Sequence, residues 1–309
     1  MTSSLSAIPH AIIMSAEFIT GITGNGFLII ISCNELIKSR KLTPMQLILI
    51  CIGMSRVGLL LMLMVQSFFS MFFPLFYQTK IYGAAMVFLW MFFSSVSLWF
   101  ATCLSVFYCL KLIGFTHPCF LWLKFRISKL MPGLLLGSLL ASVSTATLCI
   151  EVDYPKNAVE DVLRNATRTT SKFNIRSINE VLLVNFSLLF PLAIFLMCTF
   201  MLLMSLYKHT HRMQNGSRGF RSVSTEVHIN ALRTVLTFIL FFISYFAAFI
   251  TNMTFIIPHG TQRYFVLKDI MAAYPSGHSV IIIWSNSKFQ QLLRRLFCLK
   301  KSQCKEGLM

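Results

Sequence analysis

The chain has 309 residues, of which 56% are hydrophobic and only 12% are charged, and its mean hydropathy is +0.72. Soluble domains carry about a quarter of their residues as charged side chains, so this composition excludes an ordinary soluble fold. The 27 Lys and Arg residues outnumber the 10 Asp and Glu residues, and the net charge of +17 would indicate nucleic-acid binding only if the basic residues did not lie beside membrane spans.

Seven apolar stretches are long enough to cross a bilayer as helices at about 1.5 Å per residue. In chain order they cover about residues 11–33, 45–71, 84–110, 130–150, 181–206, 231–257 and 266–286. Each stretch is predicted to be helical, because backbone polar groups must be paired inside hydrocarbon and barrel strands would be shorter and alternating. A short amphipathic helix is expected at about 288–299. We therefore predict an all-α membrane protein with one domain, residues 1–309.

The basic residues indicate the orientation of this bundle. Of the 27 Lys and Arg residues, 18 lie on one side, in the segments 34–44, 111–129, 207–233 and 287–309. Cytoplasmic loops carry the excess of Lys and Arg, so this side is predicted to be cytoplasmic and the N-terminus extracellular. The positive charge then reflects orientation, and no nucleic-acid partner is expected.

Arg56 is the one basic residue well inside a predicted span. A bare guanidinium in hydrocarbon is costly, so Arg56 is expected to face the bundle interior and pair there, with Asn25 and Ser55 as predicted neighbours. The alternative is that its long side chain reaches the cytoplasmic headgroups.

Enzymatic and metal-binding motifs are weak or absent in the sequence. His209 and His211 have the spacing of metal ligands, but they lie in a basic segment without nearby Cys or carboxylates. HExxH, GxSxG and nucleotide-binding glycine loops are missing. We therefore expect no catalytic residue, no metal and no cofactor.

Two kinds of covalent modification are predicted. Asn165 begins the sequon Asn165, Ala166, Thr167 in the predicted outer segment, where a glycan can be attached. Cys298 and Cys304 lie beside the basic C-terminal tail and are candidates for palmitoylation.

Several motifs spread along the chain resemble one family. They are LICIGMSR (49–56), LSVFYCLK (104–111), FTHPCFLWLKFRISKLMPGLLLGS (115–138), SLYKHTHRMQ (205–214), STEVHINALRT (224–234) and YPSGHSVIIIWSNSKFQQ (274–291). Together they resemble the bitter taste receptors, the taste receptor type 2 family of G-protein-coupled receptors. The resemblance covers essentially the whole chain and implies a seven-transmembrane receptor bundle in the cell membrane.

The resemblance also implies a ligand pocket between the outer halves of the spans. The matching positions are Trp90, Ser94, Tyr245, Lys268 and Met271. Many relatives carry asparagine at the position of Ser94, and some carry glutamate at that of Lys268. We therefore expect a preference for neutral or anionic agonists over amines, because a cation in the pocket repels protonated alkaloids. The alternative is that these residues only pack the helices and that Lys268 reaches outer water.

A second set of residues is expected to form the switch or touch the G protein. It consists of Arg56, Tyr108, Lys111, His209, His228, His278 and Asn286. The implied partners are bitter small molecules, a gustducin-like heterotrimeric G protein and the lipid bilayer, with a receptor oligomer left open. The alternative for the basic loop residues is attraction to anionic lipid.

Two other functions remain open from the sequence. One is a chemosensory receptor of the same fold that serves outside taste. The other is a transporter or channel, which the small number of charges inside the spans disfavours.

Overall fold

A computed structural model describes residues 2–40, 42–73, 80–113, 117–166, 178–216, 223–255, 257 and 261–285, apart from some side chains within these ranges. In these residues the chain forms seven helices. They are α1 (Thr2–Ser39), α2 (Pro44–Phe72), α4 (Lys80–Leu112), α5 (Pro118–Ala166), α6 (Ile178–Gly216), α7 (Val223–Thr254) and α8 (Gln262–Ser285). The predicted all-α fold is confirmed.

Local sequence explains why a helix begins where α2 does. The Thr43 side chain accepts a hydrogen bond from the Gln46 backbone N–H, and the Gln46 side chain accepts one from the Thr43 backbone N–H. Pro44 occupies the first turn, where a missing N–H costs nothing. This reciprocal cap satisfies donors that the start of a helix leaves unpaired.

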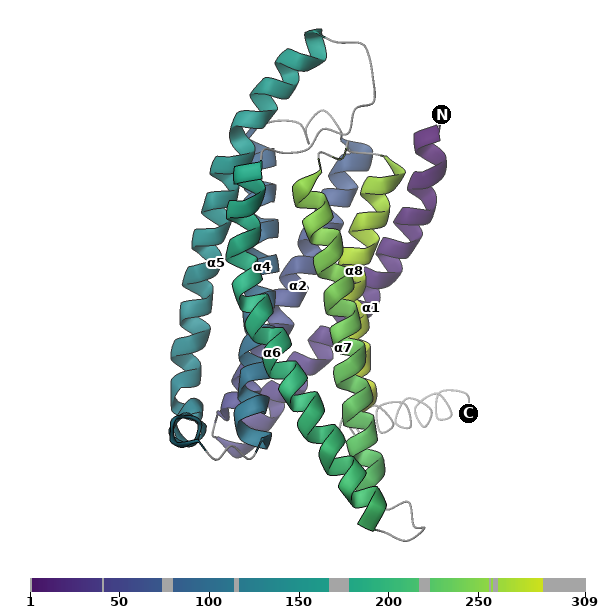
Figure 1. Cartoon of the computed structure of the whole chain (residues 1–309). Helices are drawn as coiled ribbons and strands as arrows, with labels where there is room; N and C mark the ends of the chain where they lie inside the picture. Colours follow the sequence, from purple (N-terminus) through teal and green to yellow (C-terminus); the bar gives the residue numbers. More distant parts are fainter. Residues whose placement is uncertain are drawn as a thin grey trace, which may run out of the picture.

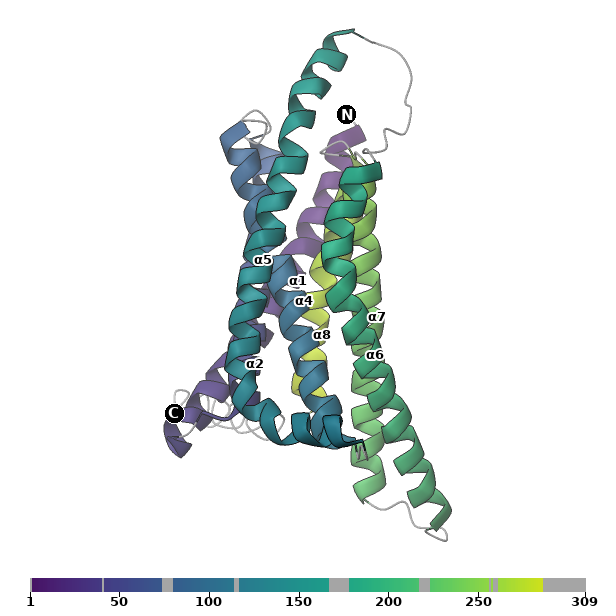
Figure 2. The same ribbon diagram turned by 60° about the vertical axis from the view of Figure 1, so that its left-hand side comes forward.

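The helices run side by side along one bundle (Figures 1 and 2). α1 packs against α2 and α8, α4 lies against α2, α5 and α6, and α7 lies between α6 and α8. α5 is the longest helix, and its C-terminal turns extend beyond the ends of the neighbouring helices (Figure 1). Its first turns lie across the other end of the bundle, whereas the rest runs along it (Figure 2). All seven helices contribute to the bundle core, and α5 packs mainly against α4 and adds Ala146 and Cys149 to it.

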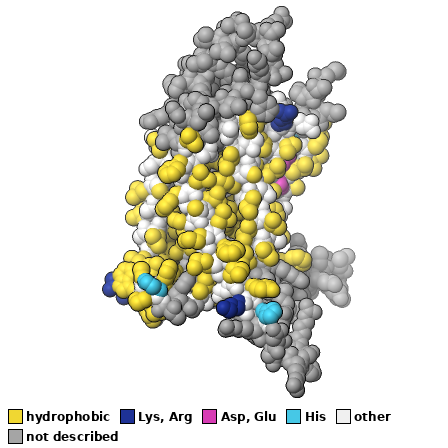
Figure 3. Space-filling model, viewed as in Figure 1, with side chains coloured by type: hydrophobic (Ala, Val, Ile, Leu, Met, Phe, Trp, Pro, Cys, Tyr) yellow, Lys and Arg dark blue, Asp and Glu magenta, His cyan; other side chains and the backbone are white. Residues whose placement is uncertain are grey.

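Five of the described helical segments are long and apolar enough to cross a membrane. They are Ile8–Lys38, Pro44–Phe72, Ile81–Leu112, Pro118–Ile150 and Asn185–Lys208, and a shorter apolar segment is Leu236–Asn252. Hydrophobic side chains cover the visible flank of the bundle (Figure 3). Large apolar side chains exposed in this way are stable only against lipid.

The helices extend beyond the hydropathy-based spans at several ends. α5 joins residues 118–129, predicted as a loop, to the span at 130–150, and it continues to Ala166. Asn165 therefore lies in the last turn of a helix and not in a loop, although its side chain is outside the described part. Hydropathy marks where lipid contact ends, and a solvated helix can continue past that point. The predicted helix at 288–299, Asn286, Cys298 and Cys304 lie outside the described residues.

Candidate functional site

The five predicted ligand residues meet in the outer half of the bundle. None of Trp90, Ser94, Tyr245, Lys268 and Met271 is more than 4% exposed. Trp90, Tyr245 and Met271 belong to one apolar cluster that joins α4, α7 and α8. Ser94 follows Trp90 by four residues on α4, so the two side chains lie on one helix face.

Lys268 of α8 is buried, and the contacts found for its amine are with uncharged side chains. Its Nζ donates a hydrogen bond to Gln66 Oε1 of α2 at 2.7 Å. It also lies 4.9 Å from the ring centre of Trp90 and 5.5 Å from that of Tyr264. No ion pair is found for Lys268 among the described residues, so each of these contacts of its amine is with an uncharged group. The expectation that Lys268 alternatively reaches outer water does not match its burial.

Three buried polar atoms of these five residues lack hydrogen-bond partners among the described residues, and one of them belongs to Trp90, which contacts Lys268. They are Trp90 Nε1, Ser94 Oγ and Tyr245 Oη. Ser94 and Tyr245 are close enough to interact electrostatically, although their hydroxyl groups do not form a well-shaped hydrogen bond. Buried polar groups are nearly always paired in folded proteins. This group can therefore donate hydrogen bonds to a molecule bound between the helices.

Aromatic rings form the walls around these donors. Trp90 stacks on Phe249 of α7 with ring centres 5.1 Å apart, and Tyr245 lies 6.2 Å from the same ring. Tyr245 also lies 5.2 Å from Tyr274 of α8. The arrangement combines apolar faces with a few polar tips and one cation, as is typical of small-molecule sites.

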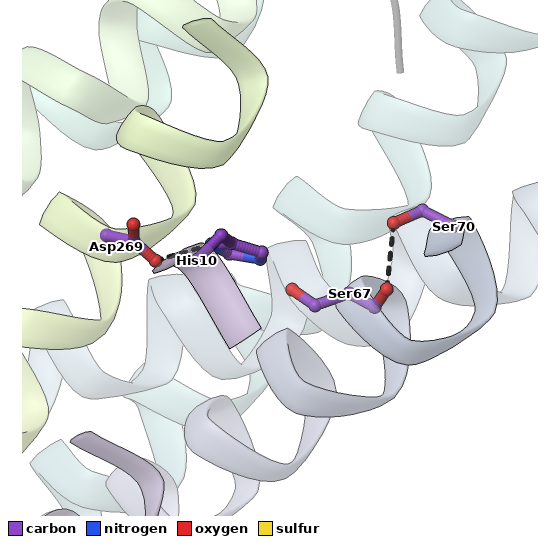
Figure 4. Close-up of polar contacts among 4 residues, drawn as sticks. All are labelled: His10, Ser67, Ser70 and Asp269. Atoms are coloured by element: carbon purple, nitrogen blue, oxygen red, sulfur yellow. Dashed lines mark hydrogen bonds and ion pairs between the residues drawn. The ribbon is translucent and has the colours of Figure 1, made fainter. Parts of the chain in front are cut away.

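A second polar contact is made by Asp269, the residue that follows Lys268 on α8. His10 of α1 is only 2% exposed, and its Nδ1 lies 2.6 Å from Oδ1 of Asp269, the residue after Lys268. The His10 ring also stacks on Phe265 at 4.5 Å. Figure 4 shows His10 between Asp269 and Ser67, the residue that follows Gln66 on α2. The pair thus ties α1 to the turn of α8 that carries Lys268.

Sequence reasoning did not select His10, Gln66 or Asp269. His10 precedes the first predicted span, at 11–33, although it lies within α1. An acidic residue next to a lysine inside an apolar stretch, as at Lys268 and Asp269, was the one available signal.

We expect His10→Leu to lower the free energy of unfolding by about 1–3 kcal/mol, because the partly buried Asp269 carboxylate loses its partner. Thermal unfolding of the detergent-solubilised protein measures this change. His10→Asn keeps an N–H donor near the position of Nδ1 and should restore most of the stability. Equal melting temperatures for His10→Leu and the unmodified protein would contradict a stabilising role for the pair.

Arg56 lies in a second polar cluster deeper in the bundle. Its side chain is 0% exposed, as internal pairing requires. Nη1 lies 2.6 Å from His278 Nδ1, and Nη2 donates to the Tyr274 hydroxyl at 3.2 Å. The guanidinium carbon also lies 5.1 Å from the Tyr274 ring centre. Arg56 therefore joins α2 to α8 through uncharged partners.

The predicted neighbours of Arg56 were wrong. Asn25 Nδ2 donates to the backbone oxygens of Gly21 and Pro275, and Ser55 Oγ donates to the Ile52 backbone oxygen. Asn25 instead satisfies the backbone of α8, where Pro275 interrupts the regular pattern. The rotation of α2 against α8, which sequence does not specify, decides which side chains Arg56 meets.

The other predicted switch residues are distributed differently. His278 contacts Phe238 of α7 with ring centres 4.1 Å apart, which extends the Arg56 cluster to a third helix. Tyr108 is near the end of α4, where its hydroxyl lies 3.9 Å from Met45 Sδ, and Lys111 is exposed one turn later. His209 lies in α6 and His228 in α7, with side chains outside the described part, and Asn286 is outside it altogether.

The chain is similar to known proteins in both sequence and fold. A family model described as "Taste receptor protein (TAS2R)" matches residues 1–301. The human protein "Taste receptor type 2 member 2" is 73% identical over 301 residues, which cover 97% of this chain and 99% of that protein. Human "Taste receptor type 2 member 9" is 33% identical over 312 residues and covers 96% of this chain. The crystal structure of squid rhodopsin aligns with a TM-score of 0.58 over 98% of this chain and 88% of that one, at 16% sequence identity, and supports the fold.

Proposed function

The chain belongs to the taste receptor type 2 family of G-protein-coupled receptors, and we propose that it binds bitter small molecules between α2, α4, α7 and α8. It is a multi-pass cell-membrane receptor for bitter compounds and not an enzyme. We further propose that it activates a gustducin-like heterotrimeric G protein, with phospholipase C activation and calcium release downstream.

The agonist site in this proposal is the cluster of Trp90, Ser94, Tyr245, Lys268 and Met271. The carrying observation is that these residues hold three unpartnered buried polar atoms and one buried amine, which lies against the Trp90 ring, among stacked aromatic side chains. A site with large apolar faces and few fixed polar contacts accepts many amphipathic molecules with modest affinity. That property suits a receptor for chemically diverse bitter compounds.

The positive charge of Lys268 makes this site favour some agonist charges over others. Gln66 is its uncharged hydrogen-bond partner, so an anionic group on a ligand would supply the missing negative charge. A protonated amine would be repelled at the same position. We therefore propose that neutral and anionic agonists bind better than cationic ones.

Signal transfer in this proposal runs through the Arg56 cluster. Arg56, Tyr274 and His278 join α2 to α8, and Phe238 adds α7. Tyr245 of the agonist site contacts Tyr274 of this cluster, so the two sites share a boundary. An agonist that changes the packing at Tyr274 shifts the population of receptors whose cytoplasmic end accepts the G protein. Tyr108, Lys111, His209, His228 and Asn286 are proposed as further switch or G-protein contacts, and Asn165 as a glycosylation site.

A calcium assay in cells that carry this receptor and a taste-type G protein tests the function. We expect responses to several members of a broad panel of bitter compounds. Cells without the G protein should stay silent, whereas uptake or currents in those cells would favour a transporter. No response across the panel, with receptor present at the cell surface, would contradict the proposal.

Hydroxyl removal tests the position of the agonist site. We expect Ser94→Ala and Tyr245→Phe each to weaken the response to agonists with an acceptor group by about threefold to tenfold, the value of one hydrogen bond. Ser95→Ala is the matched control, because consecutive helix residues point about 100° apart. Equal potencies in all three variants would place the ligand elsewhere.

A further inference from the structure

The N-terminal segment of α5, residues 118–130, differs from the rest of that helix. Pro132 and Gly133 follow it, and a proline inside a helix commonly produces a kink. The first turns of α5 lie across the cytoplasmic end of the bundle, while the remainder runs along it (Figure 2). We call residues 118–130 the interfacial segment.

One face of the interfacial segment is held against the bundle. Ile127 is buried and Leu123 packs against the same apolar cluster, which contains Ile52 and Phe107. The Lys124 ammonium group donates a hydrogen bond to the Ile113 backbone oxygen at the end of α4. These contacts fix which of the remaining faces of the segment point outward.

Two outward faces have different chemistry. At about 100° per residue, Leu121 and Phe125 share one face, and Phe125 is 78% exposed. Trp122, Arg126 and Lys129 share the next face around the helix. Trp122 is 54% exposed, and the Arg126 guanidinium carbon lies 4.9 Å from its ring centre. The segment therefore has a bundle face, an apolar face and a basic aromatic face in that order.

We propose that the interfacial segment lies in the inner leaflet and binds the headgroups of anionic phospholipids through Arg126 and Lys129. An exposed phenylalanine next to a tryptophan and two cations is the pattern of a helix at the membrane surface. The hydrophobic side chains at this end continue the lipid-facing surface of the bundle, with Lys and Arg beside them (Figure 3). The cytoplasmic leaflet carries negative lipids, so the charges are complementary.

This arrangement places the apolar face in the acyl chains and the basic face at the phosphates. Tryptophan prefers the boundary between these two regions. Because Lys124 and Ile127 tie the segment to α4, bound lipid would stabilise the contact between α4 and α5 near the G-protein side.

Trp122 fluorescence in nanodiscs tests the depth of the segment. The full-length receptor is placed in phosphatidylcholine discs in which the acyl chains are brominated near the headgroup, and the Trp122→Phe variant isolates the contribution of this residue. We expect the bromine atoms to quench Trp122. Quenching by aqueous iodide without quenching by brominated lipid would overturn the proposal.

Brominated phosphatidylserine compared with brominated phosphatidylcholine tests the charge preference. We expect stronger quenching of Trp122 by phosphatidylserine, and about a fivefold loss of that preference for each charge removed in Arg126→Gln and Lys129→Gln. Lys208→Gln, at an exposed position of α6, is the matched control and should keep the preference. Equal quenching by both lipids in the unmodified receptor would overturn the proposal. So would protection of Trp122 from iodide that arises only when the G protein is added, which would assign this face to the G protein.

Discussion

Replacing His278 with leucine is expected to destabilise the receptor by about 3 kcal/mol, because it leaves the buried guanidinium of Arg56 with one fewer partner. His278 Nδ1 lies 2.6 Å from Arg56 Nη1, and the Tyr274 hydroxyl is the other hydrogen-bond partner of the guanidinium. Thermal unfolding and cell-surface amount both measure the loss. We expect His278→Leu to lower both the melting temperature and the amount of receptor at the cell surface.

The double variant Arg56→Met with His278→Leu should recover most of this stability, because it removes the charge together with its partner. Replacing both members of a buried polar pair with apolar groups is often nearly neutral, whereas removing one is not. Signalling should remain impaired, since the polar link from α2 to α8 is gone. A double variant as unstable as His278→Leu would show that the pairing does not determine the effect.

Lys268→Gln is expected to reduce the potency of carboxylate or sulfonate agonists by about 10-fold to 100-fold, the value of a charge-assisted hydrogen bond. Lys268 is buried and the carboxylate of Asp269 is paired with His10, so the charge on Lys268 is available to a ligand. Neutral agonists should change little and serve as the internal control. Calcium responses over a concentration series measure both groups.

Charge reversal provides the stronger form of this test. Lys268→Glu should further weaken anionic agonists and improve protonated amines, because the carboxylate attracts the cation that the lysine repelled. An unchanged agonist range in Lys268→Glu, with normal surface expression, would rule out the proposed charge preference.

The seven helices and their orientation were accessible from sequence because both depend on local chemistry. A bilayer requires apolar stretches of a minimum length, and the distribution of Lys and Arg indicates the cytoplasmic side. The helix ends were less accessible, as α5 shows: residues 118–129 carry Lys124, Arg126 and Lys129 and lie outside the hydropathy-based span, but they remain helical.

The candidate site was predictable only in part. Trp90, Ser94, Tyr245, Lys268 and Met271 came from resemblance to a family, and the structure brings them together. Their supporting contacts could not be predicted, because Gln66 lies 202 positions from Lys268 and His10 lies 259 positions from Asp269. Hydropathy contains no information about pairs so far apart.

Composition and charge alone determined that this protein is a membrane bundle with its basic side in the cytoplasm, since water and lipid act on each segment separately. Only the tertiary structure decided that Arg56 meets His278 and Tyr274, that His10 meets Asp269, and that the start of α5 turns across the bundle. These contacts depend on how each helix is rotated and packed against its neighbours. The interdigitation of side chains from different segments sets that rotation, and no single segment contains it.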